Sequence, residues 1–227
     1  MKTITLTNKG YIKFTENLIN SIKKNNIELD LTIGAMDNFA FTHFKNLGFN
    51  AQLISEQNQK KFLKQNSSEF GEYMVHKLNM ITYFLERHRR VLYVDGDIVI
   101  KKNINEYLND EIGKLDLLIQ NDINLEKPDN ENLCAGFMVI NSNEKTREFF
   151  NTDNIPREII MNGLHDQGYI NSEKEKLNYK KLPSELFPNG SYFYKNFKQI
   201  NPKIIHFNYV IGRKKITTMK KYGEWYL

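Results

Sequence analysis

Two aspartates separated by one glycine, Asp95-Gly96-Asp97, are the residues of this 227-residue chain that most clearly suggest chemistry. Two carboxylates this close repel each other, so a positive partner is expected beside them. Mg²⁺ or Mn²⁺ would supply that charge, because hard divalent cations prefer oxygen ligands and also bind phosphate oxygens. A D-x-D triplet alone is equally typical of a surface turn, so its surroundings decide the interpretation.

The surroundings of the triplet favour a functional site. Four apolar residues, 91–94, precede it, and the apolar residues 98–100 follow it. A short and wholly apolar segment is typical of a buried parallel strand. Open α/β sheets bind their ligands beyond the carboxyl ends of such strands. The triplet therefore lies where a ligand is expected.

The elements that must position the triplet alternate between strand and helix in the first half of the chain. Strands are predicted at 2–6, 29–33, 51–54 and 91–94, and helices at 11–22, 38–47 and 71–87. This alternation predicts an α/β sandwich with a mainly parallel central sheet. In the second half, strands are expected at 116–120, 137–140 and 204–207, and helices at 144–150 and 165–173. Residues 183–203 are predicted to be irregular, and residues 212–221 to form a short basic helix or loop.

A second hypothesis explains the same triplet. Residues 95–99, Asp-Gly-Asp-Ile-Val, also resemble the motif of haloacid-dehalogenase-type phosphatases, in which Asp95 would be the nucleophile. Those enzymes need a later acidic pair after an apolar strand, and the sequence contains no such pair. Their triplet also lies near the start of the core domain, whereas about ninety residues precede it here. The phosphatase hypothesis therefore ranks second.

Composition narrows the partners and the compartment. The net charge is +5, but the lysines are spread along the chain, so no nucleic acid partner is expected. The single cysteine, Cys134, excludes an intrachain disulfide and a four-cysteine zinc site. The first residues are too polar for a signal peptide, and no apolar run reaches the length of a membrane span. We therefore expect a cytoplasmic chain without a transmembrane segment.

Five segments, in order, resemble one family. They are Lys77-Leu78, the strand and triplet 91–97, Cys134-Ala135-Gly136 with the strand 137–141, the segment 165–171 that begins His-Asp-Gln-Gly, and Ile205-His206 ahead of Gly212-Arg213-Lys214. Together they resemble the GT-A nucleotide-diphospho-sugar transferases of the glycogenin and bacterial α-galactosyltransferase group, and the related plant-type enzymes. The resemblance implies a single GT-A domain over residues 1–227, a Rossmann-like α/β/α sandwich. It also implies sugar transfer from a UDP-sugar with Mn²⁺ or Mg²⁺.

The resemblance also implies a role for each matching residue. Asp95, Asp97 and His206 would bind the metal. The nucleotide and diphosphate would contact Thr7, Asn8, Tyr11, Lys77, Asp95, Gly212, Arg213 and Lys214, with Lys215 as an alternative to its two basic neighbours. The transferred sugar would contact Asp166 and Gln167, and Asp122 would add a further contact. The glutamine amide would lie near the anomeric carbon, and transfer would retain the anomeric configuration.

One departure leaves the donor sugar open. The family often has Asn-x-Gly where this chain has Cys134-Ala135-Gly136, so a side-chain amide that would touch the sugar is missing. The acceptor, whether a glycan, a protein or a small molecule, is not indicated either. A catalytically idle module that only binds nucleotide sugars is a third hypothesis, which donor hydrolysis without an acceptor would exclude.

Overall fold

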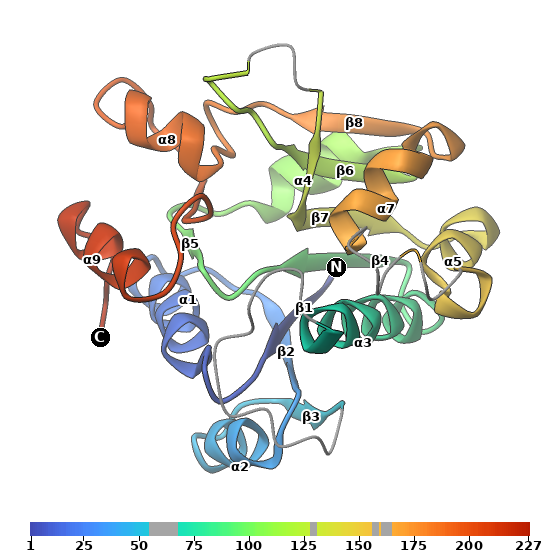
Figure 1. Ribbon diagram of the computed structural model, residues 1–227, viewed down its shortest axis with the longest axis horizontal. Coiled ribbons are helices and arrows are strands. Elements are labelled where there is room, and N and C mark those ends of the chain that lie inside the picture. Colours follow the sequence, from blue (N-terminus) through green and yellow to red (C-terminus); the bar gives the residue numbers. More distant parts are fainter. Residues whose placement is uncertain (55–67, 128–130, 156–158, 160–164) are drawn as a thin grey trace.

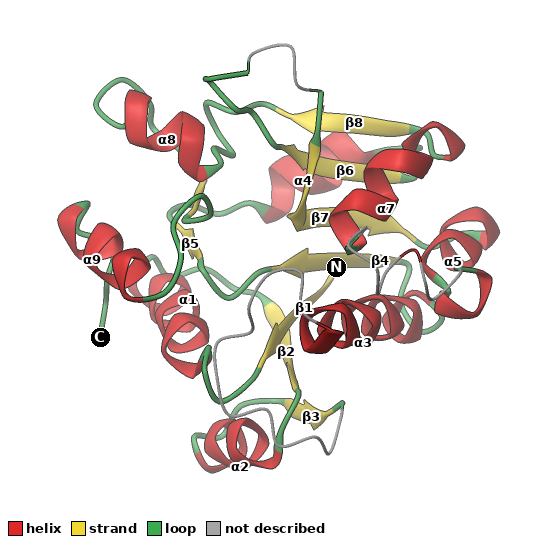
Figure 2. Ribbon diagram, in the orientation of Figure 1, coloured by secondary structure: helices red, strands yellow, loops and turns green. Residues whose placement is uncertain are grey.

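The computed structural model describes residues 1–54, 68–127, 131–155, 159 and 165–227. In this part of the chain seven strands form one sheet in the order β3-β2-β1-β4-β7-β6-β8, with helices packed on both faces (Figure 1). The predicted α/β sandwich is therefore confirmed. A smaller sheet of two strands, β5 and β9, lies beside it (Figure 2).

The first half forms the parallel side of the sheet. Strands β1 (Lys2–Thr7), β2 (Asp30–Ala35), β3 (Ala51–Leu53) and β4 (Arg90–Val94) pair in parallel. The helices between them are α1 (Ile12–Lys24), α2 (Asn38–Asn46) and α3 (Ser68–Leu85). Asp37 caps α2, because its carboxylate accepts a hydrogen bond from the Ala40 amide at 2.7 Å. These elements follow the predicted alternation closely.

The second half adds the antiparallel strands. Strand β7 (Leu133–Asn141) pairs antiparallel with both β4 and β6 (Leu117–Asn121), while β8 (Tyr179–Leu182) runs parallel to β6. The small sheet joins β5 (Ile98–Ile100) and β9 (Ile204–His206). The helices here are α4 (Asn105–Ile112), α5 (Glu144–Phe150), α7 (Asp166–Glu173), α8 (Gly190–Asn196) and α9 (Arg213–Lys221), with 3₁₀ turns at Thr152–Asn154 and Lys174–Lys176.

Alternating side chains of the central strands build a core on each face of the sheet. On β4, Val91 and Tyr93 join the cluster that packs under α3, α5 and α7. Their neighbours Leu92 and Val94 join the cluster that packs under α1 and α4. This period of two explains why a strand that is apolar throughout occupies the middle of the sheet.

Some expectations need correction. The segment 183–203 is not wholly irregular, because Asn189 caps α8 by accepting a hydrogen bond from the Tyr192 amide at 3.0 Å. Strand β8 and helix α4 were not expected from the pattern. Of the two alternatives left open for residues 212–221, the helix is confirmed, with Gly212 as the N-cap of α9. Within the described residues, no helix combines the length and apolar composition needed to cross a membrane.

The C-terminal residues that follow α9 pack against α1 and form hydrogen bonds with it. The side chain of Asn17 donates to the Glu224 carbonyl at 2.9 Å and accepts from the Tyr226 amide at 2.6 Å. The Trp225 ring packs edge-on against Phe14, with 5.8 Å between the ring centroids. We call residues 222–227 the C-terminal clasp. It holds α9 against the helix that follows β1.

Candidate metal and nucleotide-sugar site

The triplet lies in the turn between β4 and β5. The Asp95 amide donates to the Gly136 carbonyl at 2.8 Å, which continues the pairing of β4 with β7, and Ile98 then begins β5. Strand β9 pairs with β5 so that His206 lies opposite Ile98. The pairing of β5 with β9 thus brings His206 next to the two aspartates, although it lies more than a hundred positions later in the sequence.

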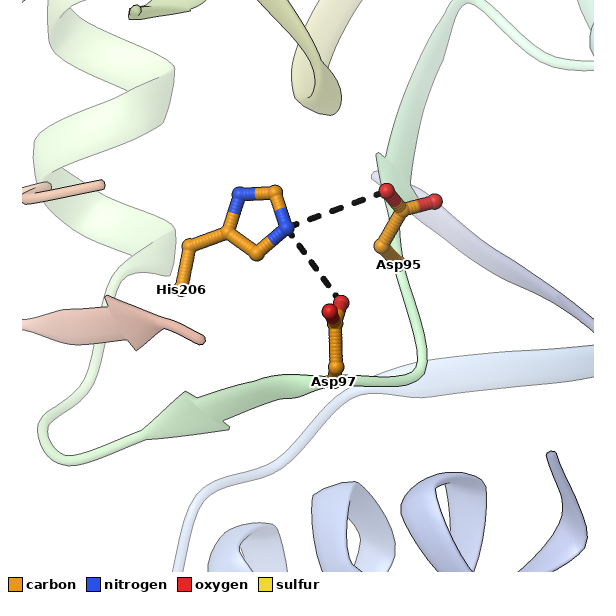
Figure 3. A group of neighbouring side chains, drawn as sticks. All are labelled: Asp95, Asp97 and His206. Atoms are coloured by element: carbon orange, nitrogen blue, oxygen red, sulfur yellow. Dashed lines mark ion pairs between the residues drawn. The ribbon is translucent and has the colours of Figure 1, made fainter. Parts of the chain in front are cut away.

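The three predicted metal ligands point toward one another (Figure 3). His206 Nε2 lies 3.3 Å from Asp97 Oδ1 and 3.9 Å from Asp95 Oδ2. One ligand atom from each residue fits within 4.8 Å of the others, and His206 and Asp97 are buried. Two carboxylates and an imidazole nitrogen are donors that suit Mn²⁺ or Mg²⁺.

Gly136 on β7 leaves the space that this group needs. A Cβ atom there would collide with the His206 ring and lie 2.6 Å from Asp95 Oδ2. A side chain at this position would therefore fill the space between two of the ligands. The space and the donor atoms together fit a bound divalent cation.

Of the three basic residues at the start of α9, Lys215 reaches the triplet. Its side chain is buried and its ammonium group forms an ion pair with Asp97, whereas Arg213 and Lys214 are exposed on the same turn. Burial raises the pKa of Asp97, but the charges of Lys215 and His206 outweigh it and hold that pKa well below its usual range. We call Asp95, Asp97, His206 and Lys215 the triplet cluster.

Lys77 is buried beneath the triplet rather than exposed on α3. Its Nζ lies 2.7 Å from Asp166 Oδ2 and 3.8 Å from Asp95 Oδ1, and it donates to the Ala135 carbonyl at 2.8 Å. Burial lowers the pKa of Lys77, but the charges of Asp166 and Asp95 raise it by more than burial lowers it. The pKa of Lys77 therefore lies above its ordinary value. A charged lysine therefore links the triplet to α7.

The predicted sugar contacts form one hydrogen-bonded group. Gln167 Nε2 donates to Asp122 Oδ2 at 3.1 Å, and Gln167 Oε1 accepts from the Ala135 amide at 3.2 Å. Asn189 donates to the other oxygen of Asp122 at 3.0 Å. Asp166 begins α7 without capping it, because the N-cap is His165. We call Lys77, Asp122, Asp166 and Gln167 the α7 cluster.

Two residues of this region were missed in the sequence. Asn189 lies at the N-cap of α8, and an Asn ahead of a Gly-Ser pair was the signal that could have marked a helix start there. Tyr209 has a left-handed backbone with φ of 63°, and burial, followed by the charge of Asp122, raises the pKa of its hydroxyl. Nothing in the sequence indicated that this tyrosine reaches Asp122.

The predicted nucleotide residues lie at the carboxyl end of β1. Thr15 Oγ1 donates to Thr7 Oγ1 at 2.9 Å, and Asn8 Oδ1 accepts from the amides of Gly10 and Tyr11. Asn8 Nδ2 is buried and has no hydrogen-bond partner among the residues the structure describes. Burial, followed by the charges of Asp97 and Asp95, raises the pKa of Tyr11 to about 12.

Comparison with known proteins places this arrangement in a wider group. The chain is 28% identical over 288 aligned positions to the UDP-galactose:fucoside alpha-3-galactosyltransferase of Dictyostelium discoideum, and the match covers all of this chain and 43% of that protein. An active-site mutant of LgtC superposes with a TM-score of 0.70 at 11% identity, covering 99% of this chain and 95% of that one. The bifunctional glycosyltransferase WbbM superposes with a TM-score of 0.61 at 16% identity, covering 92% of this chain and 45% of that one.

The chain thus spans less than half the length of the Dictyostelium relative and of WbbM. At such low identity the structural matches show the fold alone, which is the GT-A glycosyltransferase fold. The family model for nucleotide-diphospho-sugar transferases matches residues 29–219. That range contains the triplet, His206 and both clusters. The chain therefore belongs to the nucleotide-diphospho-sugar transferase family.

Proposed function

We propose that this chain is the catalytic domain of a metal-dependent glycosyltransferase that takes a sugar from a UDP-sugar. The observation that carries the proposal is the convergence of Asp95, Asp97 and His206 at the carboxyl end of β4. A divalent cation at this point would stabilise the diphosphate as it leaves the sugar. The rest of the proposal concerns what the residues around this point do.

Lys215 would hold the diphosphate together with the cation. It already lies beside Asp97, so it needs only a small movement to exchange that carboxylate for a phosphate oxygen. Two phosphates carry more negative charge than one divalent cation cancels, so a second positive group is required. Arg213 and Lys214, exposed on the same turn of α9, would add a weaker attraction from the rim.

The nucleotide base would lie beside Thr7, Asn8 and Tyr11. The buried and unpaired Asn8 Nδ2 supports this assignment, because an unmet buried donor costs free energy that a base carbonyl would recover. The half-buried Tyr11 ring offers a flat surface next to the same strand end.

The transferred sugar would lie between the triplet and the α7 cluster, with Asp166, Gln167 and Asp122 accepting or donating hydrogen bonds. Asp166 is paired with Lys77, and Asp122 already accepts bonds from Gln167 and Asn189. Both carboxylates are held by these protein partners, so neither is free to turn toward an acceptor hydroxyl as the base of an inverting reaction. This supports retention of the anomeric configuration, with the glutamine amide near the anomeric carbon.

Galactose is the first donor sugar to test, because the Dictyostelium relative is named for UDP-galactose. The acceptor of this chain stays open. The phosphatase hypothesis finds no support in the family match, and a catalytically idle binding module remains the alternative to exclude.

A donor screen tests the proposal directly. UDP-galactose, UDP-glucose and UDP-xylose are each added with Mn²⁺, and the melting temperature is measured with and without chelator. A ligand that binds only the folded state raises the melting temperature by mass action, so the preferred donor should give the largest increase. Hydrolysis of that donor to UDP would then distinguish an enzyme from an idle module. Absence of any Mn²⁺-dependent stabilisation by UDP or a UDP-sugar contradicts the proposal.

A further inference from the structure

The histidine of the triplet cluster is held from behind by a glutamine that no sequence motif indicated. Gln120, at the end of β6, is fully buried, and its Oε1 lies 2.7 Å from His206 Nδ1. On the other side of the ring, His206 Nε2 faces Asp97 and Asp95. Gln120 therefore touches the one ring nitrogen that does not face the carboxylates.

The orientation of the Gln120 amide is set by the backbone behind it. Its Nε2 donates to the carbonyl oxygens of Phe187 and Pro188, at 3.1 and 3.0 Å. A flipped amide would bring Oε1 against these two carbonyls, where acceptor would face acceptor. The amide oxygen must therefore point at His206.

This fixes the position of the imidazole proton. An amide oxygen only accepts hydrogen bonds, so Nδ1 must carry a proton to donate to it. With a cation bound between Nε2 and the two carboxylates, the ring would be neutral, and Nε2 would carry no proton and present its lone pair to the cation. The Cys134 thiol, 3.5 Å from Nδ1, is a weaker partner for the same nitrogen.

We propose that Gln120 is a positioning residue that fixes His206 in the Nδ1-protonated form, so that Nε2 is free to bind the divalent cation. The proposal rests on the proposed metal site and adds to it a residue outside the ligand set. Its physical basis is the general coupling between the hydrogen bond at one ring nitrogen and the metal bond at the other.

Two variants of Gln120 and one control test it. Gln120→Met removes the acceptor, and Mn²⁺ affinity measured by calorimetry in the presence of UDP should fall by roughly 10- to 100-fold. Gln120→Glu keeps an acceptor for Nδ1 but repels the two carbonyls, so it should bind Mn²⁺ better than Gln120→Met even where it is the less stable of the two. The control is Asn141→Leu, since Asn141 also donates to two carbonyls, of Gly113 and Leu115, and accepts from Arg90.

Nitrogen NMR gives a readout that does not depend on activity. The chain has five histidines, so the side-chain signals of His206 can be assigned with a His206→Gln variant. In the protein loaded with Mg²⁺ and UDP, Nδ1 should show a directly bound proton and Nε2 none.

The outcomes separate this proposal from the proposed function. Wild-type Mn²⁺ affinity in folded Gln120→Met, or a proton on Nε2 instead of Nδ1, overturns the role of Gln120 while leaving the metal site intact. Failure of the wild-type protein to bind Mn²⁺ with UDP overturns both. Equal losses of Mn²⁺ affinity in Gln120→Met and Asn141→Leu would show that general destabilisation is the cause, and would also overturn it.

Discussion

The triplet cluster and the α7 cluster lie side by side, yet Asp97 of the first and Asp122 of the second are held by partners of different kinds. In the triplet cluster, Asp97 faces a buried lysine and a histidine, and Asp95 keeps about a third of its side chain exposed. In the α7 cluster, Asp122 is held by neutral side-chain amides of Gln167 and Asn189. Charged partners suit a ligand that brings its own charges, such as a metal with a diphosphate, and neutral amides suit the hydroxyl groups of a sugar.

Lys77 links the two clusters. It forms an ion pair with Asp166 and lies 3.8 Å from Asp95, so it shares its charge between them. The comparison implies that the two clusters respond differently to substitution and to pH. Changes in the triplet cluster should reduce nucleotide and metal binding as well as turnover, whereas changes in the α7 cluster should reduce turnover with little effect on nucleotide and metal binding.

The largest effect is expected for Asp97→Asn. It removes one negative charge from the proposed ligand set and leaves Lys215 and His206 without their common partner. Turnover should fall by about a thousandfold or more, comparable to the loss of a preorganised group that stabilises developing charge. Calorimetric titration of UDP with Mn²⁺ should show a parallel loss of affinity. Undiminished activity of the wild-type protein in excess chelator would remove the basis for this prediction.

Asp166→Asn should reduce turnover without reducing nucleotide binding, in contrast to Asp97→Asn. The variant keeps the shape of the side chain but weakens its contact with Lys77 and with sugar hydroxyls, which matter more as the ring gains positive charge. Turnover should fall by about a hundredfold, while the affinity for UDP with Mn²⁺ stays close to that of the wild type. If this folded variant loses UDP as severely as Asp97→Asn, the assignment of α7 to the sugar is wrong.

At acid pH the contribution of Asp97 to the stability of the folded protein should be lost. The pKa of Asp97 is held below its ordinary value of about 3.9, so its stabilising effect is complete above that pH and is lost as the pH falls below it. Urea unfolding of chelator-treated protein between pH 6 and pH 2, in about half-unit steps, measures this loss. The decline should be shallower in Asp97→Asn. Equal slopes in the two proteins would contradict the assignment.

At alkaline pH the contribution of Lys77, in the α7 cluster, to the stability of the folded protein should be lost. The pKa of Lys77 is raised above its ordinary value of about 10.4, so its stabilising effect is complete below that pH and is lost as the pH rises above it. In Asp166→Asn the main cause of the raised pKa is gone. Urea unfolding above pH 10 should therefore show a steeper loss of stability in the wild type than in this variant, with buried tyrosines contributing equally to both.

The smallest effect is expected at the exposed start of α9. Lys214→Ala should raise KM for the donor by about threefold with turnover unchanged, because an exposed charge is screened by water and salt. Lys215→Met should instead reduce UDP affinity strongly, since Lys215 is the residue turned toward Asp97. Steady-state kinetics at two salt concentrations compare the two. If Lys214→Ala loses more affinity for the donor than Lys215→Met, then Lys214 rather than Lys215 holds the diphosphate.

The sequence predicted the parallel half of the fold well, because there each strand is short and apolar and each helix has a single apolar face. It also placed Asp95 and Asp97 at the end of a buried strand, which depends only on local pattern. His206 could be linked to them only through the family resemblance. Its proximity comes from the pairing of β5 with β9, and two three-residue strands carry no pattern that identifies their partner.

The register of the basic residues could not be predicted for a related reason. Arg213, Lys214 and Lys215 are adjacent, and the face of α9 that turns inward is decided by Met219, which is buried in the cluster around Phe14 and Phe207. Gln120 was missed because its importance depends on carbonyl groups of residues 187 and 188, which lie far away in the sequence. Side chains that depend on such tertiary contacts are not visible in a single sequence.

The position of the C-terminal clasp leads us to expect that the site assembles late during folding. Asn17 and Tyr226 are separated by 209 positions, and Lys215 and Asp97 by 118, whereas the parallel strands pair over shorter distances. Contacts between distant segments carry a larger loop-closure cost and tend to form late. The single tryptophan, Trp225, lies in the clasp against Phe14. Its fluorescence in a refolding experiment should therefore follow the docking of the clasp, and we expect Mn²⁺ binding to appear in that same late kinetic phase.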